Sequence, residues 1–167
     1  MIIPTRSNSD RSAQTMSGPA MLLRPLGSDR SRYWEFTSLC TPDDLRQRFG
    51  VPIPPDTAGD KLLNITGASI QSLAAFGGEG TLLALAQIVA IAPTTAEVGI
   101  MVRSDHKKRG IGRALLAALV NEARAARLIE LRATVLRENL AMCGLARKVG
   151  FVTFGSSGLV IEFRFIL

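Results

Sequence analysis

The sequence has 167 residues and a formal net charge of +6, since 20 Lys and Arg residues outnumber 14 Asp and Glu residues. This length can bury one hydrophobic core and is short for two ordinary domains, and the longest apolar run, residues 81–92, is too short to cross a bilayer. The few aromatic residues do not alternate with basic ones, so the composition favours neither a nucleic-acid nor a membrane partner. We expect residues 20–167 to form one domain behind a disordered tail, residues 1–19, which lacks apolar periodicity.

The cysteine and histidine content argues against a disulfide framework and a metal site. Cys40 and Cys143 are too few for such a framework, and one histidine without clustered cysteines does not predict metal binding. The N-terminus also lacks the apolar segment of a secretory signal. We therefore expect a cytoplasmic monomer or homodimer with reduced thiols and no metal, whose positive charge suits an anionic ligand.

The first part of the chain is predicted to be mainly helical. A short strand at residues 21–24 precedes helical sequence at residues 28–49. Within it, Thr41 and Pro42 have the residue types of an N-cap and a first helical position, so a second helix is expected to begin there. Residues 51–59 are rich in proline and are predicted to form a loop.

The rest of the chain alternates strand and helix patterns. Runs of apolar and β-branched residues predict strands at 69–76, 81–92, 96–102, 129–136, 151–154 and 159–166. Apolar residues three and four apart predict helices at 110–124 and 139–149. The predicted order is β-α-α-β-β-β-α-β-α-β-β.

A basic turn joins the strand at 96–102 to the helix at 110–124. It has five basic side chains from Arg103 to Arg109, counting His106, and ends in Gly110-Ile111-Gly112. The first turn of a helix leaves amides without partners and its dipole attracts negative charge, while glycine lets an anion approach the backbone. This stretch therefore predicts an anion site. The alternative is a basic turn that only caps a helix.

Two common nucleotide loops do not fit this turn. A Walker loop needs Lys and Ser or Thr after its second glycine, whereas Gly112 is followed by Arg113 and Ala114. A dinucleotide loop needs a third glycine where Leu115 stands.

Two segments together resemble the GNAT superfamily of N-acetyltransferases. Lys107-Lys108-Arg109-Gly110-Ile111-Gly112 is similar to the coenzyme A pyrophosphate loop of that family, with Lys107 where Gln or Arg is usual. Residues 138–151 resemble its second signature, Asn-x-x-(apolar)-x-x-Leu-(Tyr)-x-x-x-Gly-Phe. The resemblance covers about residues 21–167 and implies a mixed α/β fold. Its sheet would be twisted, mostly antiparallel and flanked by helices, with the strands on either side of the long helix splayed around the cofactor.

The same resemblance implies acetyl-CoA as cosubstrate and assigns residues to it. Backbone groups of Ile100, Met101 and Val102 would bind the pantetheine. Asn139 would contact the cofactor, cap the following helix, or do both. The loop residues would hold the pyrophosphate: Lys107, Lys108, Arg109, Gly110, Ile111, Gly112, Arg113 and Ala114.

Acyl transfer to an amine needs a group that removes a proton. A lysine amine has a pKa near 10.4, so forming the free base at pH 7 costs about 4–5 kcal/mol. Glu97, in the strand expected to line the cleft, is the candidate general base. Glu79 and Glu138, near strand ends, are alternatives, and Glu97 could instead lie in water or in an ion pair.

The main departure from the family pattern is Ala146, where many members have a tyrosine that protonates the leaving thiolate. A thiol pKa near 8.5 makes the thiolate a tolerable leaving group without that acid. Cys143, one helical turn earlier, is the other candidate acid.

A narrower resemblance concerns the acceptor. Residues 34–50, 96–105 and 135–142 resemble bacterial protein lysine acetyltransferases that act on acyl-CoA synthetases, which implies a protein lysine as acceptor and places Glu97 at the catalytic glutamate. Three alternatives stay open: an enzyme acting on a small amine or antibiotic, a non-catalytic coenzyme A sensor, and a nucleic-acid binder.

Overall fold

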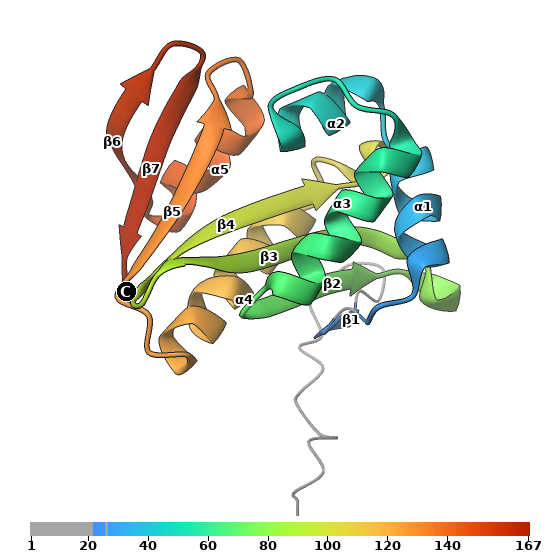
Figure 1. Ribbon diagram of the computed structural model, residues 1–167, viewed down its shortest axis with the longest axis horizontal. Helices are drawn as coiled ribbons and strands as arrows, with labels where there is room; N and C mark the ends of the chain where they lie inside the picture. Colours follow the sequence, from blue (N-terminus) through green and yellow to red (C-terminus); the bar gives the residue numbers. More distant parts are fainter. Residues whose placement is uncertain (1–21, 26) are drawn as a thin grey trace, which may run out of the picture.

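The computed structural model describes residues 22–25 and 27–167, so the tail expected at residues 1–19 lies outside the described residues (Figure 1). In this part of the chain, seven strands form one sheet in the order β1-β2-β3-β4-β5-β7-β6. The strands are β1 (Leu22–Pro25), β2 (Gln71–Phe76), β3 (Leu82–Ala92), β4 (Thr95–Val102), β5 (Glu130–Leu136), β6 (Val152–Ser157) and β7 (Val160–Ile166). All neighbours are antiparallel except β4 and β5, which are parallel. The predicted mixed, mostly antiparallel fold is confirmed.

The sheet splits between β4 and β5. These strands pair only from Thr95–Glu97 to Glu130–Arg132, while β4 continues on β3 and β5 continues on β7. The two strands therefore diverge toward their carboxyl ends, as Figure 1 shows. The splay that the sequence resemblance implies is confirmed.

Among the described residues, five helices cover the two faces of the sheet: α1 (Arg30–Ser38), α2 (Pro42–Phe49), α3 (Pro55–Ala68), α4 (Ile111–Ala125) and α5 (Leu140–Val149). Buried residues of α1, α2 and α3 pack with Leu85 and Met101 on one face. Residues of α4 and α5 pack with Ile88 and Val98 on the other. Side chains alternate along a strand, so Glu97 and Gly99 share the face of Met101, toward α1–α3.

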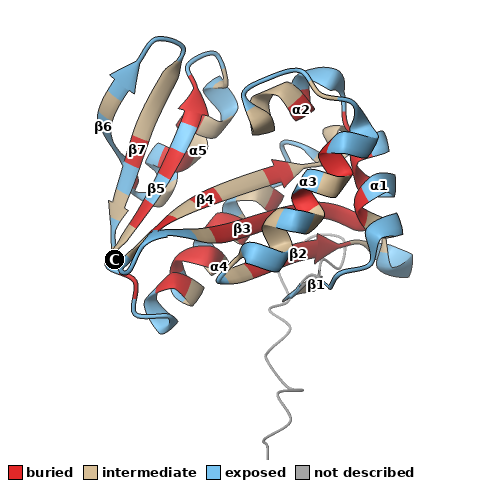
Figure 2. Cartoon of the chain, viewed as in Figure 1, coloured by how far each residue is buried: buried red, intermediate tan, exposed pale blue. Residues whose placement is uncertain are grey.

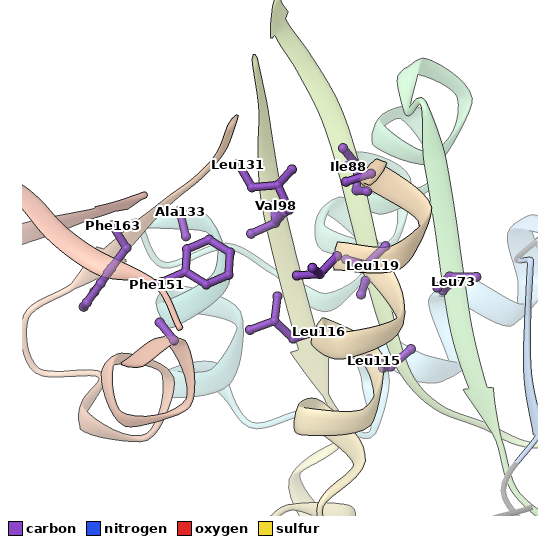
Figure 3. Packing of buried hydrophobic residues seen from close by; sticks show 14 of the residues in the cluster. Leu73, Ile88, Val98, Leu115, Leu116, Leu119, Leu131, Ala133, Phe151 and Phe163 are labelled. Atoms are coloured by element: carbon purple, nitrogen blue, oxygen red, sulfur yellow. The ribbon is translucent and has the colours of Figure 1, made fainter. Parts of the chain in front are cut away.

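Helix α4 supports both halves of the split sheet. Its residues Leu115, Leu116 and Leu119 are fully buried. Burial of each leucine side chain stabilises the fold by about 1.5–3 kcal/mol. Figure 3 shows these leucines between α4 and the strands of the first half, and Phe151 and Phe163 of the second half belong to the same cluster. Burial is concentrated in β2–β5 and the helix faces turned to them, whereas β6 is a largely exposed edge (Figure 2).

The prediction of a loop at residues 51–59 is wrong from Pro55 onward, because α3 begins there. The observed order of elements therefore contains one helix more than the predicted order. Pro54 and Pro55 read as loop residues, but proline at the first helical position costs no hydrogen bond. Gly59 also weakens the helical pattern, yet it allows close packing, since a Cβ there would collide with Trp34 of α1. The predicted start of α2 is confirmed: Thr41 is its N-cap.

Candidate functional site

The split in the sheet opens into a cleft of about 970 Å³. It passes from the α4–α5 side of the sheet, where Gly112 and Leu145 line it, to the other side, where Arg48 and Ile65 line it. The unpaired ends of β4 and β5 form its walls. This volume matches that of small-molecule and cofactor sites.

The glycine loop forms one end of the cleft. Gly110 is the N-cap of α4 with a left-handed backbone (φ 80°), and Ile111, Gly112 and Arg113 are the first helical residues, whose amides lack an intrahelical acceptor. These four residues line the cleft, as do Lys107 and Lys108. Arg109 and Ala114 are not among its lining residues, and the Ala114 amide donates to the Gly110 carbonyl. The end of the cleft is thus suited to an anion.

A buried carboxylate ties this loop to α2. Asp44, whose side chain is 7% exposed, accepts hydrogen bonds from Lys107 Nζ, Ser104 Oγ and the Thr41 amide. Burial acts to raise the pKa of Asp44, but the hydrogen bonds from Lys107, Ser104 and Thr41 together outweigh it and lower the pKa below its ordinary value. The Lys107 side chain is therefore held toward α2 by an ionised partner.

The backbone of β4 presents polar groups to the split. The Arg103 amide donates to Leu83 of β3, and backbone direction alternates along a strand, so Met101 also faces β3. Ile100 and Val102 consequently turn their N–H and C=O groups toward the gap between β4 and β5. Asn139 lines the same gap and caps α5, with its side chain accepting from the Met142 amide at 3.0 Å.

Glu97 lines the cleft on the α1–α3 side and is half-buried. Among the described residues, its carboxylate has no hydrogen-bond or ion-pair partner. The two alternatives for the base do not line the cleft: Glu138 pairs with Arg46, and Glu79 lies in the exposed turn after β2. Ala146 and Cys143 are buried in the core and do not line it either.

Sequence reasoning missed two cleft residues. Arg48 of α2 and Gln87 of β3 meet in the cleft, where Arg48 Nη2 donates to Gln87 Oε1 at 3.0 Å. Two signals were available in the sequence. Gln87 interrupts an otherwise apolar strand, and Arg48 lies four residues after Asp44 and so on the same helix face.

Within residues 22–25 and 27–167, no three His, Cys, Asp or Glu side chains gather as metal ligands. In the same part of the chain, no helix combines the length and apolarity needed to cross a bilayer.

A split sheet with a basic glycine loop at a helix N-terminus is suited to bind an anionic cofactor. The chain belongs to the acetyltransferase (GNAT) family, whose model matches residues 41–151, more than half of the sequence. It is therefore an acetyltransferase.

Solved structures agree with this assignment. The GNAT domain of PAT from S. lividans is 25% identical, with a TM-score of 0.79 over 88% of this chain and 90% of that one. The ribosomal-protein-alanine N-acetyltransferase of Brucella melitensis is 22% identical (TM-score 0.68; 87% of this chain and 99% of that one). A phosphinothricin acetyltransferase from Sinorhizobium meliloti, in complex with AcCoA, is 18% identical (TM-score 0.71; 88% of both chains). The last two similarities show the fold.

Proposed function

We propose that the protein transfers the acetyl group of acetyl-CoA to an amine, with Glu97 as general base. The observation that carries this proposal is the Glu97 carboxylate, which has no hydrogen-bond or ion-pair partner among the described residues and lines a cleft whose other end is a basic helix N-terminus. The presence of AcCoA in the phosphinothricin acetyltransferase structure supports the choice of cosubstrate.

The cleft offers separate places for the parts of the cosubstrate. The amides of Ile111, Gly112 and Arg113, with the Lys108 side chain beside them, would hold the pyrophosphate. The backbone groups of Ile100 and Val102 would hydrogen-bond the pantetheine in the gap that β5 leaves open. Acetyl-CoA supplies the acyl group as a thioester.

The residues on the α1–α3 side would handle the amine. Glu97 takes a proton from the acceptor ammonium, and the free amine attacks the thioester carbonyl carbon. The carbon–sulfur bond then breaks, the attacking nitrogen gives up its second proton to water, and the leaving thiolate takes up a proton from water or from Glu97. With Ala146 in the place of a tyrosine, no side chain at that position supplies this proton.

For the acceptor we propose a protein lysine, in the cytoplasm. Support comes from the three segments of the sequence that resemble lysine acetyltransferases acting on acyl-CoA synthetases. A small amine is the second candidate, because Arg48 places a cation inside the cleft beside Glu97.

The test uses labelled acetyl-CoA and a soluble proteome that contains acyl-CoA synthetases, with wild type beside Glu97→Gln. Label on a synthetase lysine that is lost with the variant is the expected result. Tight acetyl-CoA binding with no labelled protein would contradict the lysine acceptor and direct the search to small amines. Binding without transfer to any amine would indicate a coenzyme A sensor.

A further inference from the structure

Arg48 is a half-buried cation that forms no ion pair among the described residues. It lies near the end of α2 and lines the cleft, with its Cζ 5.5 Å from the centre of the Phe49 ring. Its Nε is buried and has no hydrogen-bond partner, and among the described residues no carboxylate oxygen lies within 4.0 Å of its nitrogen atoms. Arginine is rarely buried unless it is paired. The Nε of this half-buried side chain therefore lacks the partner that its burial calls for.

The surrounding residues hold the guanidinium in this place. Gln87 is fully buried, and its Nε2 donates to the Leu62 carbonyl and to Thr66 Oγ1, both at 2.9 Å. These two bonds fix the amide so that Oε1 faces Arg48. Gly99, the β4 partner of Gln87, leaves the space that the guanidinium fills, since a Cβ there would collide with it.

The nearby carboxylates do not neutralise Arg48. Asp44, one turn earlier on α2, is occupied by Lys107 and Ser104. Burial lowers the pKa of the Arg48 guanidinium, and the charge of Glu97 acts in the opposite direction without forming an ion pair with it. Arginine remains charged in proteins, so an anion brought by a ligand would relieve this cost.

The Arg48 guanidinium lies close to Glu97, the proposed base. Glu97 and Gly99 are two residues apart on one face of β4, a spacing of about 6–7 Å. An acceptor whose amine reaches Glu97 could therefore place a second group against the guanidinium over Gly99.

We propose that Arg48 and Gln87 form an anion subsite that binds a carboxylate of the acceptor while the amine of the acceptor faces Glu97. This inference rests on the proposed function and narrows its substrate class to amines that carry a nearby carboxylate. The carboxylate can belong to a small amino acid or to an acidic residue beside a lysine, and the two sources are separated by the test.

The test compares acceptors that differ only in the carboxylate. One pair is leucine and leucinamide, and the other is the end-blocked dipeptide Lys-Glu and its Lys-Gln counterpart. The ratio of kcat/KM within each pair is measured for wild type, Arg48→Gln, Arg48→Lys and Gly99→Ala. Arg124→Gln is the matched control, because Arg124 is exposed on α4 and does not line the cleft. Comparing ratios between variants cancels the different pKa values of the two amines.

In wild type the subsite is expected to raise the kcat/KM ratio of each carboxylate acceptor to its amide about ten- to a hundredfold, the range for a charge-assisted hydrogen bond. The ratio should therefore be about ten- to a hundredfold lower in Arg48→Gln than in wild type, partly lower in Arg48→Lys and Gly99→Ala, and unchanged in Arg124→Gln. A preference in the leucine pair assigns a small amino acid, and one in the peptide pair assigns a protein. Equal ratios in wild type and Arg48→Gln for both pairs would overturn the subsite while leaving acetyl transfer intact.

A binding measurement keeps the subsite testable without catalysis. Succinate and succinamide are titrated into the coenzyme A complex and followed by ligand-observed NMR. Succinate binding that exceeds succinamide binding and disappears in Arg48→Gln supports the subsite, even if absence of transfer overturns the proposed function. Indistinguishable binding of the two probes to wild type would overturn the subsite, whether or not a variant folds.

Discussion

Asp44→Asn should lower the stability of the fold and loosen the contact that holds Lys107 of the glycine loop. The substitution keeps the shape of the side chain but removes the charge that holds Lys107 Nζ. A hydrogen bond to a charged group contributes about 1.5–3 kcal/mol. The Lys107 side chain is 42% exposed, so solvent partly screens the ion pair and we expect its loss to lower the free energy of unfolding by about 1–2 kcal/mol. For a protein of this size this lowers Tm by about 2–8 °C at pH 7.

The effect should depend on pH in a defined direction. The pKa of folded Asp44 lies below its ordinary value of 3.8, so its stabilisation is complete above that value and is lost as pH falls through the folded-state pKa. The Tm difference between wild type and Asp44→Asn should therefore be constant from pH 7 to about pH 5 and shrink below about pH 4. Differential scanning fluorimetry from pH 7 to pH 3 measures it.

The neighbouring carboxylate provides the control. Asp43 is on the same helix but is 60% exposed and pairs with Arg46, so Asp43→Asn should change Tm by less than about 2 °C. Equal Tm values for the two variants, or a difference from wild type for Asp44→Asn that persists unchanged to pH 3, would refute the reasoning.

Three further outcomes follow from the structure. Lys108 lines the cleft with a left-handed backbone (φ 61°), so Lys108→Gly should leave Tm unchanged or raise it while weakening acetyl-CoA binding severalfold in calorimetry; a lower Tm would contradict the strain argument. Leu116→Ala should cost about 2–5 kcal/mol in urea unfolding, since Leu116 is fully buried, and a cost below 1 kcal/mol would argue against this packing. Burial raises the pKa of the Cys40 thiol to about 12, so iodoacetamide at pH 8 should modify Cys40 only after denaturation, and rapid labelling of the native protein would be inconsistent with its burial.

The glycine loop and the sheet could be predicted because their signals are local. Gly110 and Gly112 stand where a strand meets a helix, and the structure has both elements there. Helix α3 could not be predicted, because Pro54, Pro55 and Gly59 have weak helix propensity and the helix is stabilised by packing on α1.

The positions of the residues around Glu97 are set by contacts between distant parts of the chain. Arg48 and Gln87 are 39 residues apart and meet because α2 packs on the face of the sheet to which Leu85 and Gln87 of β3 point. The engagement of Lys107 by Asp44 is also a long-range contact, which no spacing rule relates to the loop motif. The sequence therefore predicted the geometry of the glycine loop better than the contacts around Arg48 and Gln87.

Glu97→Gln tests the central claim most directly when transfer and binding are measured together. Stopped-flow release of coenzyme A with a saturating amine acceptor gives the rate, and calorimetry gives the affinity for acetyl-CoA. The account predicts a rate that is about 10²–10⁴-fold lower with an unchanged affinity, as for loss of a general base. A Glu97→Gln protein that transfers acetyl groups at the wild-type rate at pH 7 would contradict it.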